Sequence, residues 1–170
     1  MNRLIRYATL VDSNILGEIH SESLQEAFKS IIPDHILNEE FCAERRAKGF
    51  TRELSEASPK TAIAFEGNES AGLISFGKSR YDNNDTPWIE IWRVYIIPKF
   101  WGNGLAKDLM EWAVKEVQEK NFTNIELWVF EENIRARKFY EKIGFIHDNN
   151  LQVINVGNEL KELRYIKSFR

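Results

Sequence analysis

The sequence predicts an α/β fold in which a central mixed β-sheet of about seven strands carries helices on both faces. Three observations predict this fold. Apolar residues recur at helical spacing between Asp12 and Ser55 and at strand spacing after Pro59. The predicted order is strand, two helices, three strands, helix, strand, helix and two strands. The strand–helix–strand step in the centre of this order indicates a mixed sheet with helices on both faces.

The N-terminal part of the chain predicts one strand and two helices. Leu4 to Ala8 is the strand. Asp12 or Ser13 caps the first helix, and Pro33 ends it. Asp34 caps a second helical stretch that runs to about Ser55. The apolar positions of the first helix recur at three- and four-residue steps, and they are Ile15, Leu16, Ile19, Leu24, Ala27 and Phe28.

Strand spacing begins after Pro59. Thr61 to Phe65 and Ala71 to Gly77 flank a Gly-Asn turn and predict a hairpin. Tyr81 to Thr86 is rich in Asn and Asp and predicts a loop. Trp88 to Ile97 is β-branched and aromatic, which predicts a long strand that ends at Pro98.

The second half predicts two more helices and three more strands. The helices run from Leu105 to Lys120 and from about Asn133 to Ile143, the second being ended by Gly144. The strands are Asn124 to Phe130, Phe145 to Asn155 and Leu160 to Ser168, the last two flanking a turn at Gly157 and Asn158.

Composition and size indicate one globular domain from Met1 to Arg170. Apolar residues make up 43% of the chain and charged residues 29%, and no repeat or linker divides it. A domain of about this size buries roughly 70% of its unfolded surface, so its core needs no metal or disulfide. The one cysteine, Cys42, is interpreted as a packing residue in the second helical stretch.

Charge and hydropathy exclude several classes of partner. The net charge of −3 gives no electrostatic support for binding nucleic acid or an anionic membrane. No run of apolar residues is long enough to predict a spanning helix, and the N-terminus lacks a signal-peptide pattern, so we expect a cytoplasmic protein.

A glycine turn between a strand and a helix is the first feature with chemical meaning. Gly102 and Gly104 follow Trp101 and come directly before the helix that starts at Leu105. Glycines let backbone approach a ligand, and the first N–H groups of a helix favour an anion such as a pyrophosphate. The turn is not a P-loop, because no Gly-Lys-Ser/Thr follows, and the dinucleotide fingerprint fails at Lys107. A structural tight turn alone would also explain these glycines.

A second motif makes the first one specific. Asn133 opens a helix after a strand, and Ala136, Phe139, Tyr140, Gly144 and Phe145 follow at fixed spacing. Together with Trp101 to Ala106, this pattern resembles the GNAT superfamily of acyl-CoA N-acyltransferases. That family has Gln or Arg where Trp101 stands. The predicted order of elements also agrees with the GNAT fold, so the resemblance covers nearly the whole chain.

The resemblance implies acetyl-CoA as co-substrate and assigns roles to the matching positions. It places the pantetheine amides on the strand end and the pyrophosphate on the glycine turn. Asn133 would bind the pantetheine arm, and Tyr140 would stand near the sulfur. Trp101, which lacks the usual side-chain donor, is interpreted mainly as a packing residue. The cofactor-binding residues expected in this way are Val94, Tyr95, Ile96, Trp101, Gly102, Asn103, Gly104, Leu105, Ala106, Asn133, Arg135, Ala136 and Tyr140.

Two residues are expected to be catalytic. Tyr140 has a phenol that can protonate the departing thiolate. Glu90 aligns with the glutamate that several enzymes of the family use as general base. Strand alternation predicts that Glu90 shares one face with Trp92, Val94 and Ile96. The alternative interpretation of Glu90 is a solvent-facing residue or an ion pair with Arg93.

The remaining titratable groups predict no metal site. His20, His35 and His147 lack the spacing of metal ligands and are interpreted as ordinary surface or core residues. Arg135, Arg137 and Lys138 form a solvated helix face, from which one residue could meet the adenosine 3′-phosphate.

The acceptor is expected to be a primary amine. Three segments, 90–96, 127–133 and 156–159, resemble the polyamine and diamine branch loosely. Aminoglycosides, amino-acid amines and protein N-terminal or lysine amines also remain open. A binding protein of the same fold that senses acetyl-CoA without turnover is the alternative. Dimers are common in the family, so a homodimer through the C-terminal hairpin is one expectation. The expected acceptor residues are Glu18, Glu22, Glu26, Glu39, Asp82, Asp85, Trp88, Glu90 and Trp92.

Overall fold

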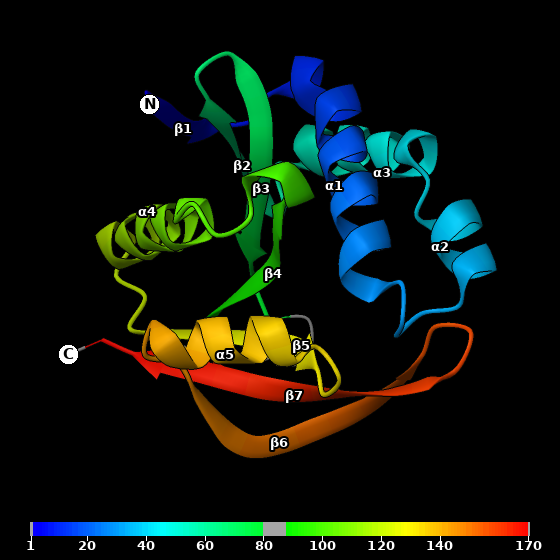
Figure 1. The fold of residues 1–170 in the computed structure, drawn as a ribbon. Helices are drawn as coiled ribbons and strands as arrows, with labels where there is room; N and C mark the ends of the chain where they lie inside the picture. Colours follow the sequence, from blue (N-terminus) through cyan, green and yellow to red (C-terminus); the bar gives the residue numbers. More distant parts are fainter. Residues whose placement is uncertain (1, 80–87, 170) are drawn as a thin grey trace.

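A computed structural model describes residues 2–79 and 88–169, and its strands form one mixed sheet (Figure 1). The strand order is β1-β2-β3-β4-β5-β7-β6, with only β4 and β5 parallel among the described pairs. The predicted loop Tyr81 to Thr86 lies outside the described residues. The strands are β1 (Arg3–Tyr7), β2 (Lys60–Glu66), β3 (Glu69–Gly77), β4 (Trp88–Ile96), β5 (Asn124–Phe130), β6 (Ile146–Asn155) and β7 (Glu159–Ser168).

The helices agree with the prediction except in one place. The stretch from Asp34 to Ser55 was predicted as one helix, and this is wrong, because α2 ends at Glu40 and α3 begins at Ala43. Cys42 between them has an extended backbone with ψ 152°, so the helix cannot continue through it. No helix in the described ranges is long and apolar enough to cross a membrane. The helices are η1 (Leu10–Asp12), α1 (Ser13–Phe28), α2 (Asp34–Glu40), α3 (Ala43–Glu56), η2 (Pro98–Phe100), α4 (Leu105–Glu119) and α5 (Ile134–Lys142).

Helices cover both faces of the sheet, as the sequence predicts. On one face, Leu105, Leu109 and Val117 of α4 are buried in the same cluster as Ile74 and Ile125 of the sheet. On the other face, the helices α1 and α3 contribute a second cluster. That cluster contains Leu16, Ile19, Phe50, Ile63 and Leu73. The sheet is therefore the middle of three layers.

A bulge in β4 changes which of its side chains share a face. Ser75 of β3 is opposite Arg93, and the next residue, Phe76, is opposite Ile91, so Trp92 is an extra residue on β4. Such a bulge reverses the alternation of side chains that follow it. The predicted grouping of Glu90 with Val94 is therefore wrong.

The two core clusters show the actual faces of β4. Ile89, Ile91, Val94 and Ile96 all join the cluster beneath α4. Tyr95 and Ile97 join the cluster beneath α1 and α3. Glu90 lies between Ile89 and Ile91 and therefore points to the α1 side. It shares that side with Arg93, whose guanidinium lies 5.2 Å from the Phe50 ring centre.

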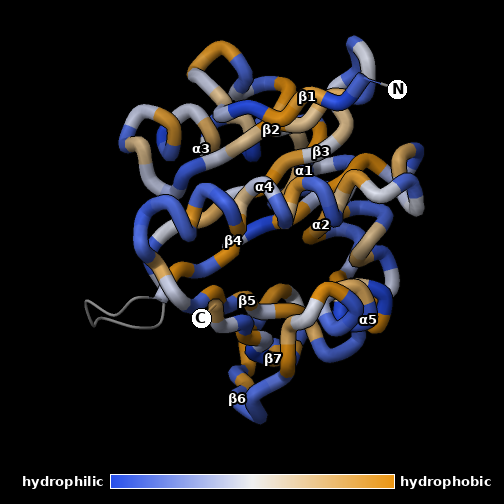
Figure 2. Tube along the Cα trace, turned by 90° about the vertical axis from the view of Figure 1, so that its left-hand side faces the viewer, coloured by the Kyte–Doolittle hydropathy of each residue, from blue (hydrophilic) through white to orange (hydrophobic). Residues whose placement is uncertain are grey.

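The parallel pairing of β4 with β5 is short, and the place where it ends determines where a ligand can enter the sheet. Pairing is confined to residues 88–91 of β4 and 124–127 of β5. Figures 1 and 2 show the result, since β5, β6, β7 and α5 group together, apart from β1 to β4 and the other helices. Beyond Ile91 the two strands separate, and the separation leaves room for a ligand between them.

The start of α1 is anchored by a buried carboxylate. Asp12 is 4% exposed and accepts hydrogen bonds from Arg6 at 2.9 Å and from the Thr9 backbone at 2.7 Å. The Arg6 guanidinium lowers the pKa of Asp12 from its usual 3.8 to about 2. A lowered carboxyl pKa stabilises the fold above the unfolded value, and this stability is lost as the pH falls through 3.8 toward 2.

We expect Asp12→Asn to lower the free energy of unfolding by about 2 kcal/mol at pH 7. At pH 2 most of the difference from the wild type disappears, because Asp12 is then protonated in the unfolded chain and about half protonated in the folded one. Urea unfolding of both proteins at pH 7 and pH 2 measures this difference in the free energy of unfolding. An equal deficit at both values would show that Asp12 acts through packing and not through its charge.

Candidate active site

A cavity of about 1160 Å³ opens where β4 and β5 separate. Residues 91–96 of β4 and 127–130 of β5 form its floor. Two further groups of residues form its arms. The glycine-turn arm consists of Phe100, Trp101, Gly102, Gly104, Leu105, Ala106, Asn133, Arg135, Ala136, Phe139 and Tyr140. The helical arm consists of His20, Ser23, Leu24, Glu26, Ala27, Phe28, Phe41 and Arg46.

The expected cofactor-binding residues come together here, with one exception. Asn103 does not line the cavity, because it stabilises the glycine turn from behind. Its side-chain oxygen accepts from the Leu105 N–H at 3.0 Å, and its amide donates to Glu66 at 3.0 Å. Arg3 donates to the Asn103 carbonyl at 2.6 Å. The turn is thus tied to β1 and β2.

The glycine turn has the conformation that glycine alone adopts easily. Gly102 has φ +80° and Gly104 has φ +89°, and both are exposed at the cavity. No heavy atom outside the neighbouring residues lies within 4 Å of the Cβ position of Gly102. A ligand can therefore approach this backbone closely, next to the start of α4.

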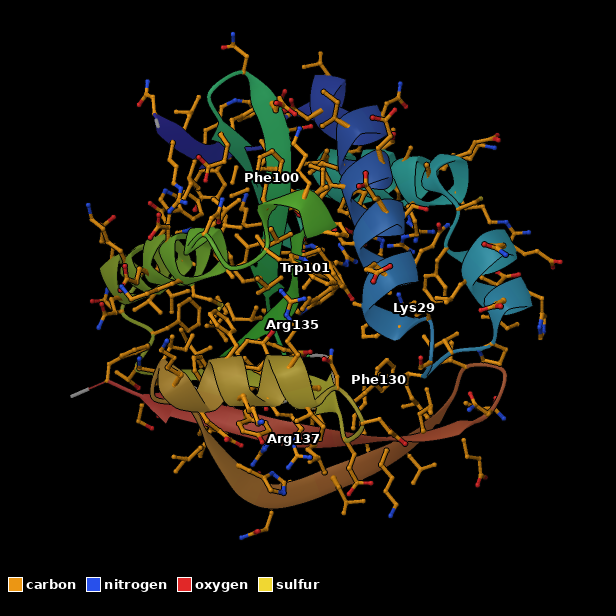
Figure 3. All side chains as sticks on the ribbon, viewed as in Figure 1. Lys29, Phe100, Trp101, Phe130, Arg135 and Arg137 are labelled. Atoms are coloured by element: carbon orange, nitrogen blue, oxygen red, sulfur yellow. The ribbon has the colours of Figure 1, made fainter. Side chains whose placement is uncertain are left out.

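Trp101 connects the glycine turn with β4 and α5. Its indole N–H donates to the carbonyl oxygen of Ile96 at 2.7 Å. The Arg135 guanidinium lies 3.5 Å from the centre of the indole ring, and Figure 3 shows it reaching from α5 toward Trp101. Trp101 therefore packs between the two motifs, with its indole N–H bonded to β4.

The start of α5 is fixed by its own residues. The Asn133 side chain accepts from the Ala136 N–H at 3.2 Å and so caps the helix. Arg137 is half-buried and donates to the Glu131 carbonyl at 2.9 Å and to the Tyr165 hydroxyl at 3.2 Å. The prediction of a fully solvated basic face is therefore wrong for Arg137, which anchors α5 to β7.

Tyr140 lines the cavity and packs among aromatic rings. Its ring centre is 5.3 Å from that of Phe139 and 5.9 Å from that of Phe145. Within the described ranges its hydroxyl has no hydrogen-bond partner. Burial raises the pKa of Tyr140, so the phenol remains protonated at neutral pH.

Glu90 occupies a different environment from the one expected of it. It is 0% exposed, opposite Gly77 on β3 and beside Glu126 on β5, and it does not line the cavity. Of the other expected acceptor residues, Glu26 and Trp92 do line the cavity. Asp82 and Asp85 lie outside the described residues. Glu18, Glu22, Glu39 and Trp88 do not line the cavity.

The helical arm contains polar groups that the sequence did not single out as functional. His20 is 4% exposed, and its Nδ1 accepts from the Nε–H of Arg46 at 2.8 Å. Burial holds the pKa of His20 well below its usual value, so the imidazole is neutral. Its ring meets that of Tyr95 edge-on at 4.7 Å. In the sequence, the sign of these groups was that His20 and Ser23 lie three residues apart among the apolar positions of the first helix.

The described part of the chain contains no group of three or more potential metal ligands. His35 is exposed, and the Nδ1 of His147 lies 2.9 Å from the Arg164 carbonyl oxygen.

Comparison with known proteins gives a consistent match. The model of the acetyltransferase (GNAT) family matches residues 22–145. An uncharacterized N-acetyltransferase of Archaeoglobus fulgidus is 43% identical over 51 residues, which are 30% of this chain and 35% of that protein. An uncharacterized N-acetyltransferase of Porphyra purpurea is 30% identical over 95 residues, which are 56% of this chain and 52% of that protein. The match thus spans about half the length of the relative from Porphyra and less of the other.

Solved structures share the whole fold at low identity. The PaiA N-acetyltransferase from Thermoplasma acidophilum, in complex with coenzyme A, superposes with a TM-score of 0.76 at 21% identity, covering 99% of this chain and 100% of that one. The yncA putative acetyltransferase from Salmonella typhimurium, with its cofactor acetyl-CoA, superposes with a TM-score of 0.75 at 16% identity. The superposition covers 100% of this chain and 95% of that one. At these identities the comparison establishes the fold, and it confirms the predicted architecture.

Proposed function

The chain belongs to the acetyltransferase (GNAT) family, and from this premise we propose that it transfers the acetyl group of acetyl-CoA to a primary amine. The observation that carries the proposal is the cavity at the β4–β5 separation. One arm ends at a glycine turn suited to phosphate, and the other is closed by side chains of α1 and α3. Tyr140 lines the cavity where a thioester and an amine would meet.

Backbone groups make the glycine-turn arm suitable for acetyl-CoA. The edge of β4 that faces β5 has no strand partner beyond Ile91 in the described residues, so its peptide groups suit the amides of pantetheine. Val94, Tyr95 and Ile96 supply that edge. The N–H groups from Gly102 to Ala106 hold the pyrophosphate, and Asn133 orients the pantetheine arm. Arg135 lies close enough to the turn to reach the adenosine 3′-phosphate.

The residues of the chain orient the thioester and the amine and supply a proton to the departing sulfur. When the amine attacks the thioester carbonyl, negative charge develops on the carbonyl oxygen, and an N–H group of β4 stabilises it. The C–N bond forms as the C–S bond breaks. Tyr140, whose phenol is protonated at neutral pH, gives the proton that the departing sulfur needs.

An alkyl ammonium must lose a proton before it attacks, and the proposal gives this role to Glu90. Because Glu90 does not line the cavity, the proton passes through water. We expect Glu90→Gln to lower kcat/KM about tenfold at pH 7, and the deficit to shrink toward pH 10, where the amine loses its proton unaided. The pH profile of kcat/KM measures this. A deficit that is constant with pH would assign Glu90 to folding instead.

The first test is the release of free CoA thiol from acetyl-CoA by the purified protein across a panel of amines that includes spermidine. Release that depends on the amine supports the transferase. Binding of acetyl-CoA without release on any amine would instead support the non-catalytic sensor. Strong release with spermidine would assign the chain to the polyamine class of acceptors.

A further inference from the structure

The helical arm of the cavity combines an apolar wall with polar side chains. Leu24, Phe28 and Phe41 supply the apolar wall. The polar side chains are His20, Ser23 and Glu26 of α1 and Arg46 of α3. The proposed function does not use His20, Ser23 or Arg46.

Arg46 presents a cation to this cavity without a carboxylate partner in the described structure. Its Nε–H donates to His20, which is neutral, and no carboxylate oxygen in the described ranges lies within 4.0 Å of its guanidinium. The nearby Glu53 is bound by both terminal nitrogens of Arg93, at 2.6 Å each. A half-buried guanidinium with unused donors is suited to a ligand anion, and its planar fork matches a carboxylate.

Ser23 supplies an independent observation. It is 1% exposed and lines the cavity, and its hydroxyl has no hydrogen-bond partner in the described residues. A buried polar atom without a partner costs free energy, so such an atom at a cavity suggests a ligand atom that completes its bonding. Ser23 follows His20 by three residues and therefore lies on the same face of α1.

His20 completes the set of donors. Because its Nδ1 accepts from Arg46, the proton of the neutral ring is on Nε2. The donors of Arg46, His20 and Ser23 therefore all belong to one arm of the cavity, and none of these side chains carries a negative charge. The three carboxylates that line the cavity in the described residues have partners of their own. Glu26 accepts from Lys29 at 2.7 Å, Glu111 from Lys107 at 2.6 Å and Glu162 from Gln152 at 2.6 Å.

We propose that Arg46, with Ser23 and His20, binds the carboxylate of the acceptor, so that the acceptor is an amino acid with an apolar side chain. This proposal rests on the proposed function and defines the substrate of the same site. The ring of Tyr95 touches that of His20, and Tyr95 and Tyr140 line the same cavity, so the anion site and the proposed acid belong to one continuous site. The amine displaces the thiolate and forms the amide, while the carboxylate is unchanged.

The test compares amino acids with the amines that remain when the carboxylate is removed. Phenylalanine is paired with phenethylamine and leucine with isopentylamine, and spermidine represents polycations. Arg46→Gln is the test variant. Arg45→Gln is its matched control, because it removes the same charge from the adjacent residue of α3, where Arg45 is exposed and paired with Glu40 at 2.5 Å.

We expect Arg46→Gln to lower kcat/KM about 10- to 100-fold for the amino acids and to change it little for the paired amines. Comparing variants on one substrate removes the difference in amine basicity between the paired compounds. Arg45→Gln leaves kcat/KM unchanged for both members of each pair. Arg46→Lys restores part of the loss because it keeps the positive charge. An equal loss for both members, or a preference for spermidine that does not depend on Arg46, overturns the proposal.

A direct binding measurement separates this proposal from the proposed function. If the wild type releases no CoA with any amine, calorimetry with the CoA-saturated protein compares N-acetylphenylalanine, which has a carboxylate and no ammonium, with N-acetylphenethylamine. Binding of the first compound that is lost in Arg46→Gln supports the anion site even when the transferase fails. Absence of such binding in the wild type, or binding independent of Arg46, refutes it.

Discussion

Replacing Tyr140 with Phe is expected to lower kcat about 100- to 1000-fold while acetyl-CoA binds almost as before. The ring contacts with Phe139 and Phe145 are retained, so only the hydroxyl is lost. That hydroxyl has no protein hydrogen-bond partner in the described structure, and hence the melting temperature changes little. The wild-type phenol is protonated throughout the neutral pH range, so the loss is expected at every pH near neutral. Single-turnover thiol release measures the chemical step directly.

Tyr165→Phe is the matched control for this prediction. The Tyr165 ring centre is 6.5 Å from that of Tyr140, but its hydroxyl donates to Glu141 at 2.7 Å and accepts from Arg137. Its loss should lower the free energy of unfolding by about 1 kcal/mol and leave kcat within a few-fold of the wild type. If Tyr140→Phe kept more than about a third of the wild-type rate, the role of Tyr140 as an acid would be wrong.

The order of strands and helices was predictable because local patterns determine it. Periodicity, Pro33, Pro59, Pro98 and Gly144 are local signals, and the elements they predict are found. The break at Cys42 and the bulge at Trp92 were not predicted, because an apolar or aromatic residue gives no local sign of a changed backbone. The bulge matters most, since it moves Glu90 to a different face from Val94 and Ile96.

The two arms of the cavity were predictable to different degrees. The glycine turn and the Asn133 motif are compact sequence patterns, and the resemblance assigned their residues together. In the helical arm, His20 and Arg46 are 26 positions apart, and only the packing of α1 on α3 brings them within 2.8 Å. The exposed glutamates of α1 suggested a cationic acceptor. Glu18 and Glu22 do not line the cavity that the fold creates, and Glu26, which does, is paired with Lys29.

That packing depends on Gly17, and Gly17→Ala is the second substitution with a large expected effect. An added Cβ would lie 2.5 Å from the Ala43 carbonyl oxygen and 2.7 Å from the Ala47 nitrogen. Both are backbone atoms of the neighbouring helix and cannot rotate away, so α3 must move. We expect the free energy of unfolding to fall by about 2 kcal/mol, although alanine favours a helix over glycine by about 1 kcal/mol. Urea unfolding measures the change.

Gly49→Ala provides the contrast that isolates the cause. Gly49 lies in α3 itself, and the nearest atom to its added Cβ would be the Arg46 Nη2 at 3.9 Å, an ordinary contact. The same substitution should therefore raise stability there by about 0.5 to 1 kcal/mol through helix propensity alone. A loss of stability only at Gly17, with weakened turnover of amino acids, would show that the close approach of α1 and α3 positions Arg46 beside His20. Equal effects at both glycines would mean that propensity, and not helix packing, determines the outcome.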